Sequence, residues 1–166
     1  MKWTISNAVF VADVDDEHKG IFDALRAFQD ALTRGSSGDC AKGMRRLLTI
    51  LDAHFAHEER LMRAARYGSL RWHKRSHDNA SKQVHEFARR IEAGDIKAGD
   101  ELTEHLTQWL HEHTGTADKM MGASLRNHMR SIGKLTVRAG TRRADACAWA
   151  TASGEAFDPL TGNTIA

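Results

Sequence analysis

Five histidines and two carboxylic acids fall on four separate stretches of this chain that each have helical periodicity. They are His18, His54, Glu58, His73, His77, His113 and Asp118. Ionisable side chains are poor material for a protein core unless each finds a partner, so this pattern constrains the fold strongly. Imidazole and carboxylate together suit transition-metal ions, and a single shared metal site is therefore the leading hypothesis.

The composition is that of a globular domain with a helical preference. The chain has 166 residues, of which 41% are hydrophobic and 28% charged, enough for one domain with a proper core. The single proline, Pro159, leaves the preceding sequence free to form long helices. The net charge of +2 implies no particular partner, and two cysteines, Cys40 and Cys147, are too few for a disulfide framework. Without a signal peptide or an apolar membrane span, we expect a cytoplasmic protein with free thiols.

Apolar residues recur at intervals of three and four in four segments, which predicts four helices joined by short loops. The expected helices cover about residues 15–34, 40–66, 69–93 and 100 onward, with Asp15 or Asp16 as the first N-cap and Ser69 as the third. We expect an all-α, up-down antiparallel four-helix bundle, an apolar N-terminal arm across one bundle end, and a C-terminal helical extension. The expected domains are the bundle at 1–121 and a basic helix with a flexible tail at 122–166.

The spacing of the candidate ligands fits this bundle. Residues four apart on a helix share one face, so His54 can act with Glu58 and His73 with His77. His18 adds a nitrogen from the first helix. His113 and Asp118 add two donors from the end of the fourth, where a spacing of five would turn them about 140° apart on a regular helix.

The donor types favour iron. Structural zinc sites are usually rich in thiolate, and calcium and magnesium prefer oxygen, whereas imidazole with bridging carboxylate suits iron, or less well manganese, cobalt or copper. Five nitrogens and two bridging carboxylates supply nine bonds to two ions that need twelve. A bridging oxygen would supply two more, which leaves one open position for a small diatomic ligand.

Four stretches of the sequence resemble the hemerythrins, specifically the bacterial hemerythrin-like domains. They are residues 13–19, 54–62, 73–77 and 109–118, and the resemblance spans about residues 3–121. It implies two non-haem iron ions joined by an oxo or hydroxo bridge. In the implied site, His73, His77 and His113 hold the coordinatively full iron, and His18 and His54 hold the iron with the open site. Glu58 and Asp118 bridge the two ions, and dioxygen binds at the open iron.

Several neighbouring residues have alternative interpretations. Glu59 could replace Glu58 as the bridge, although spacing from His54 favours Glu58. Phe55 and Trp109 are either ordinary core residues or the wall of a dioxygen pocket. Thr114 stands where family members commonly have isoleucine, and a hydroxyl there predicts a wetter pocket and faster loss of bound dioxygen.

We therefore expect reversible dioxygen binding for sensing, delivery or storage, and we favour a binding protein over an enzyme. The first alternative is a di-iron redox enzyme acting on peroxide or nitric oxide, although di-iron oxidases usually have more carboxylate ligands. The second is an oxygen- or redox-sensing module that acts on a signalling partner through residues 122–150. Spaced arginines without aromatic residues give no reason to expect nucleic-acid binding.

Overall fold

The computed structural model describes residues 2–95, 97–138, 149–150, 156–157 and 164–165. Its long helices are α1 (Ala12–Thr33), α2 (Ser37–Ala64), α3 (Leu70–Glu92), α4 (Ala98–Gly115) and α5 (Ala117–Arg138). The short 3-10 helix η1 (Ile5–Asn7) precedes them. Three two-residue strands, β1 (Trp149–Ala150), β2 (Ala156–Phe157) and β3 (Thr164–Ile165), pair antiparallel in that order and were not expected.

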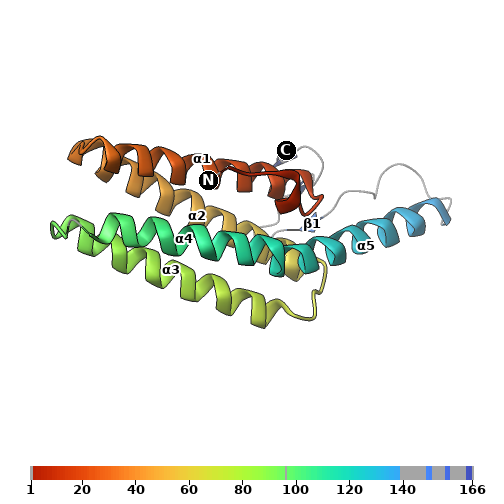
Figure 1. Ribbon diagram of the computed structural model, residues 1–166. Helices are drawn as coiled ribbons and strands as arrows, with labels where there is room; N and C mark the ends of the chain where they lie inside the picture. Colours follow the sequence, from red (N-terminus) through yellow and green to blue (C-terminus); the bar gives the residue numbers. More distant parts are fainter. Residues whose placement is uncertain (1, 96, 139–148, 151–155, 158–163, 166) are drawn as a thin grey trace.

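Helices α1 to α4 form the predicted up-down bundle, in which each helix packs against the next and α4 returns to α1 (Figure 1). Helix α5 follows α4 directly and extends past the bundle end that carries the α2–α3 turn (Figure 1). The all-α fold with a C-terminal helical extension is thus confirmed. Residue 121, the expected domain boundary, lies inside α5, and the boundary itself stays a prediction.

The start of α1 and the capping of α3 differ from the expectation. Helix α1 begins at Ala12 with Val11 as its N-cap, so neither Asp15 nor Asp16 caps it. The Asp15 carboxylate instead accepts a hydrogen bond from the backbone N–H of Val9 at 2.8 Å, which ties the N-terminal arm to the helix. Ser69 is the N-cap residue of α3, as expected, but its side chain makes no capping hydrogen bond.

The core has two parts. The larger cluster lies between α1, α2, α3 and α4 and is built from residues such as Phe28, Leu47 and Leu106, each completely buried. The smaller cluster joins Val9 of the N-terminal arm to Met121 of α5 at the bundle end. The arm thus covers this end only in part, because Val9 and Val14 are buried while Ile5 and Phe10 are exposed. In the part of the chain that the structure describes, we find no helix with the length and apolar character of a membrane span.

Candidate metal centre

The seven candidate ligands converge between the two core clusters. His18 comes from α1, His54 and Glu58 from α2, His73 and His77 from α3, His113 from α4 and Asp118 from α5. All are buried, with exposed fractions of 6% or less. Their donor atoms form two groups that share Glu58, one of five residues and one of three. The structure therefore brings together all seven of the candidate ligands that the sequence indicated.

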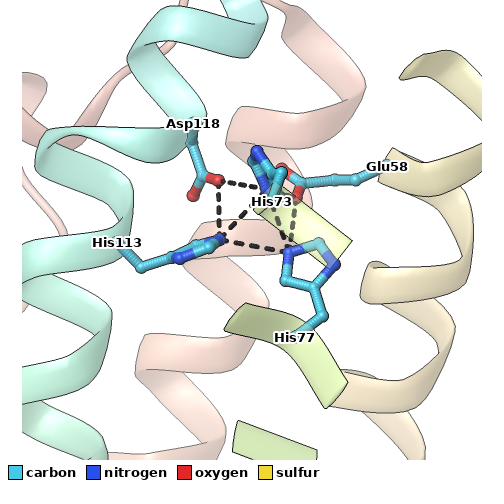
Figure 2. A group of neighbouring side chains, drawn as sticks. All are labelled: Glu58, His73, His77, His113 and Asp118. Carbon is cyan, nitrogen blue, oxygen red and sulfur yellow. Dashed lines mark hydrogen bonds and ion pairs between the residues drawn. The ribbon is translucent and has the colours of Figure 1, made fainter. Parts of the chain in front are cut away.

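The five-residue group has the spacing of donors around one ion. The Nε2 atoms of His73, His77 and His113 lie 3.1 Å from one another, and Glu58 Oε2 lies 3.2 Å from His73 and 3.1 Å from His77 (Figure 2). Adjacent donors on an octahedral ion with bonds of about 2.1 Å would be about 3.0 Å apart. The residues thus fit a metal ion in size as well as in chemistry.

The contacts of the two carboxylates indicate which donors face each other. Asp118 Oδ1 lies 3.2 Å from His73 Nε2 and 3.1 Å from His113 Nε2. Among these five described residues, no ion pair joins Asp118 to His77 or Glu58 to His113, although all five donor atoms lie within 4.8 Å. Those pairs therefore lie across the site from each other. The direction opposite His73 receives no side chain of this group.

Each carboxylate turns its second oxygen toward the other group. Glu58 Oε1 lies 3.7 Å from His54 Nε2 and 3.9 Å from His18 Nε2, and Asp118 Oδ2 lies 3.2 Å from His18 Nε2. The first group thus has three nitrogens and two oxygens, whereas the second has two nitrogens and the Glu58 Oε1 oxygen, with Asp118 Oδ2 beside His18. Each carboxylate therefore has one oxygen beside the first group and one beside a histidine of the second.

A break in the helix places Asp118 over His113. The sequence placed both residues at the end of one helix, but α4 ends at Gly115 and α5 begins at Ala117. Between them Thr116 has φ −129° and ψ −68°, and its N–H donates to the His113 carbonyl. The break replaces the regular rotation that would have turned the two side chains apart.

Several donor atoms have no hydrogen-bond partner among the described residues. They include His18 Nε2 and Asp118 Oδ2, which lie 3.2 Å apart but without hydrogen-bond geometry, and Glu58 Oε1, all buried. Leaving such groups unpaired costs about 1–3 kcal/mol each, and more for charged ones. A bound cation would satisfy all three, which is a second indication that the residues fit a metal.

The carboxylates are held in their anionic form. Burial acts to raise the pKa of Glu58, but the surrounding histidines outweigh it and lower the pKa to about 2. The same balance holds the pKa of Asp118 well below its usual range. Burial disfavours the charged form of His73, yet hydrogen bonds to Asp118 and Glu58 raise its pKa to about 9. For His77 burial dominates and lowers the pKa.

Aromatic rings cover two of the candidate ligands. Phe55 stacks on His77 with ring centres 4.2 Å apart, and Trp109 stacks on His113 at 4.3 Å. The two aromatic rings meet edge to face at 5.5 Å. Both residues named from the sequence thus lie beside the site.

Glu59 lies outside both donor groups. Its Oε2 accepts a hydrogen bond from Arg63 at 2.8 Å, and its Oε1 lies 3.4 Å from Lys74 Nζ and 3.9 Å from His77 Nδ1. These contacts favour Glu58 over Glu59 as the bridging residue.

Two residues that contact the candidate ligands were not anticipated. Glu17 contacts the Nδ1 atom of His54, and Ser76 lies 3.1 Å from the Nδ1 atom of His113. Glu17 immediately precedes His18, but a sequence neighbour points about 100° away on a helix. Only the packing of α1 on α2 shows that Glu17 faces His54.

Comparison with known proteins identifies the family. The family model for the hemerythrin HHE cation-binding domain matches residues 9–130. This chain belongs to the hemerythrin family. Among its relatives, bacteriohemerythrin from Methylococcus capsulatus is 28% identical over 75% of this chain and 96% of its own length. Bacteriohemerythrin from Pseudomonas aeruginosa strain LESB58 is 31% identical over 73% of this chain and 78% of its own.

The likeness extends to a protein named hemerythrin and to a solved structure. Hemerythrin from Siphonosoma cumanense is 31% identical over 70% of this chain and 86% of its own length. A crystal structure of wild-type hemerythrin has a TM-score of 0.69 and 28% identity, covering 75% of this chain and 97% of that one. Family membership and the buried cluster together support a non-haem iron protein that binds oxygen.

Proposed function

We propose that the seven residues hold two non-haem iron ions and that the protein binds dioxygen reversibly at this pair. The observation that carries the proposal is the position of the carboxylate oxygens. Each carboxylate has one oxygen near the first donor group and its other oxygen near His18 or His54. A site for one ion would not need this arrangement. The unequal number of donors in the two groups supports one well-filled ion and one with room for a ligand.

The proposed ligand sets follow the two groups. His73, His77 and His113, with Glu58 Oε2 and Asp118 Oδ1, would hold the first ion. His18 and His54, with Glu58 Oε1 and Asp118 Oδ2, would hold the second. No side chain of the first group fills the direction opposite His73, so an oxygen bridge could be accommodated there. Two bound iron ions would supply the two electrons that dioxygen would take up on binding.

The protein's contribution is ligation and a dry pocket. Phe55 and Trp109 lie against ligands and against each other, and we propose that they wall the dioxygen pocket and restrict water. Thr114 is buried beside His113, and its hydroxyl accepts a hydrogen bond from the Asn7 side chain at 3.2 Å. That hydroxyl keeps a polar group next to the site where the family commonly has an apolar one.

One observation favours a sensing role within this function. Helix α5 carries Asp118 in its first turn and continues to Arg138, past the end of the bundle (Figure 1). A change in the position of Asp118 on ligand binding would therefore act directly on the C-terminal extension. Proteolysis of the extension in the reduced and dioxygen-bound forms tests this role, and equal rates would argue against it.

Spectroscopy of the anaerobically reduced protein tests the main proposal. We expect a colourless reduced form that gains charge-transfer absorption on addition of dioxygen and loses it when dioxygen is removed. Steady turnover of peroxide or nitric oxide with a reductant would instead indicate a di-iron redox enzyme. Immediate conversion to a stable ferric spectrum would contradict reversible binding.

A further inference from the structure

Glu17 joins a candidate iron ligand to a second histidine that lies outside the site. Its Oε2 lies 2.8 Å from His54 Nδ1, and its Oε1 lies 2.7 Å from His57 Nδ1. His54 and His57 are three apart on α2 and so share a face, toward which α1 directs Glu17. The side chain of His54 is 3% exposed, that of His57 is 12% exposed and that of Glu17 is 34% exposed. The three form a chain from the candidate site to a partly exposed carboxylate and from there to a second histidine.

This contact selects one tautomer of His54. A neutral imidazole carries its proton on either nitrogen, and an ionised carboxylate can only accept hydrogen bonds. With Glu17 at Nδ1, the proton stays on that nitrogen and the lone pair stays on Nε2. It is His54 Nε2 that faces Glu58 Oε1, so the selected tautomer is the one that can bind a metal.

Among the five candidate histidine ligands, His54 is distinguished by this outer partner. Within the described residues, the Nδ1 atoms of His18, His73 and His77 have no hydrogen-bond partner, and that of His113 contacts the Ser76 hydroxyl. The Glu59 oxygen near His77 Nδ1 is 3.9 Å away, beyond hydrogen-bond distance. The direct carboxylate contact thus falls on the donor group that has fewer protein ligands.

We propose that Glu17 is a positioning residue that fixes His54 in its metal-binding tautomer and makes it a stronger donor to the second iron. A carboxylate that accepts the outer N–H of a ligand histidine raises the basicity of the ligand. His57 holds the other oxygen of Glu17 and keeps this partly exposed carboxylate from turning into solvent. The inference rests on the proposed di-iron site, because it assigns Glu17 to one half of that site.

The test compares Glu17→Gln with Asp16→Asn. Glutamine keeps the shape of Glu17, but it has one acceptor oxygen and an NH₂ group, so it cannot accept from both histidines. Asp16→Asn removes the same charge from the neighbouring residue, whose side chain is 73% exposed and pairs with Lys19 on the surface. We expect Glu17→Gln to lower the affinity of one Fe²⁺ per chain by about 10–100-fold and to leave the other unchanged. Asp16→Asn should leave both unchanged.

Nitrogen-15 NMR of the metal-free protein gives a readout independent of iron. At alkaline pH, where the imidazoles are neutral, we expect wild-type His54 to carry its proton on Nδ1 and the Glu17→Gln variant to show a changed tautomer at His54 or His57. The variant His57→Gln should retain the His54 tautomer and should lose less affinity for Fe²⁺ than Glu17→Gln does. Thermal unfolding identifies any variant that is merely misfolded.

The outcomes separate the two proposals. Wild-type protein that binds fewer than two irons per chain would overturn the di-iron site. Two irons in wild type, with the same affinities and the same tautomers in Glu17→Gln, would overturn the role of Glu17 and leave the di-iron site intact.

Discussion

Replacing Gly122 with alanine tests whether the ligand-bearing helix α5 is locked to the N-terminal arm. Gly122 lies one turn after Asp118, where α5 passes against the arm. A Cβ atom at this position would lie 2.6 Å from the Val9 carbonyl oxygen and 3.0 Å from Val9 Cβ. The same carbonyl accepts a hydrogen bond from Arg126, whose guanidinium also lies over the Phe10 ring at 5.7 Å.

The magnitude follows from two opposing effects. Alanine in place of glycine inside a helix gains about 1 kcal/mol of helix propensity. The new methyl group meets backbone that cannot easily move, because Val9 is buried and its N–H is bonded to Asp15. Overpacking costs about 1–3 kcal/mol, and weakening the charge-assisted Arg126 hydrogen bond adds about 1.5 kcal/mol. We therefore expect Gly122→Ala to lower the free energy of unfolding by about 2 kcal/mol.

Urea unfolding of the metal-free protein measures this loss. Gly20→Ala is the matched control, since Gly20 also lies within a helix but a Cβ there would meet no atom within 4 Å. The control should be unchanged or more stable by up to about 1 kcal/mol. Gly122→Ala should also retain less iron, because α5 carries Asp118. Equal stability of the two variants would refute the argument that α5 is held against the arm.

Three further predictions concern the site itself. Between pH 7 and 9 the metal-free protein should lose stability to urea, because the raised pKa of His73 favours folding only while that histidine is protonated. Over the same pH range the affinity for iron should rise, since His73 must be neutral to bind a metal. Stability and iron affinity that both stay constant with pH would contradict this prediction. Asp118→Asn should reduce iron binding in both halves of the site, as measured by iron content, and loss of one iron alone would argue against a bridging role. Thr114→Val should slow oxidation of the bound iron to the ferric form. It should also lower the free energy of unfolding by about 1–3 kcal/mol, because the Asn7 side chain loses its hydrogen bond to Thr114. Stopped-flow oxidation rates equal to those of wild type would refute the wetter-pocket interpretation.

The sequence contained enough information to predict the bundle and which candidate ligands would come together in it. Four-residue spacing on a helix is a geometric constraint, so His73 and His77 had to share a face, and their Nε2 atoms are indeed 3.1 Å apart. The periodicity beyond residue 121 correctly predicted a helix, which α5 provides as far as Arg138. Most of the expected flexible tail lies outside the described residues.

Features that depend on how helices pack could not be predicted in the same way. The break at Thr116 is a local backbone conformation, and without it the relation of Asp118 to His113 could not be worked out. The early start of α1 follows from Val9 and Val14 being buried at the bundle end rather than from a capping residue. Glu17 has its role only because α1 and α2 pack with that side chain between them.

Mössbauer spectroscopy of the protein loaded with ⁵⁷Fe tests the central claim most directly, because it counts iron and distinguishes its environments together. We predict two irons per chain, strongly reduced in the His73→Ala/His77→Ala variant. After addition of dioxygen the two should give two resolved quadrupole doublets of equal area, as expected for a five-donor and a four-donor half. A single iron per chain, or two irons retained in the double variant, would contradict the assignment of these residues as the metal centre.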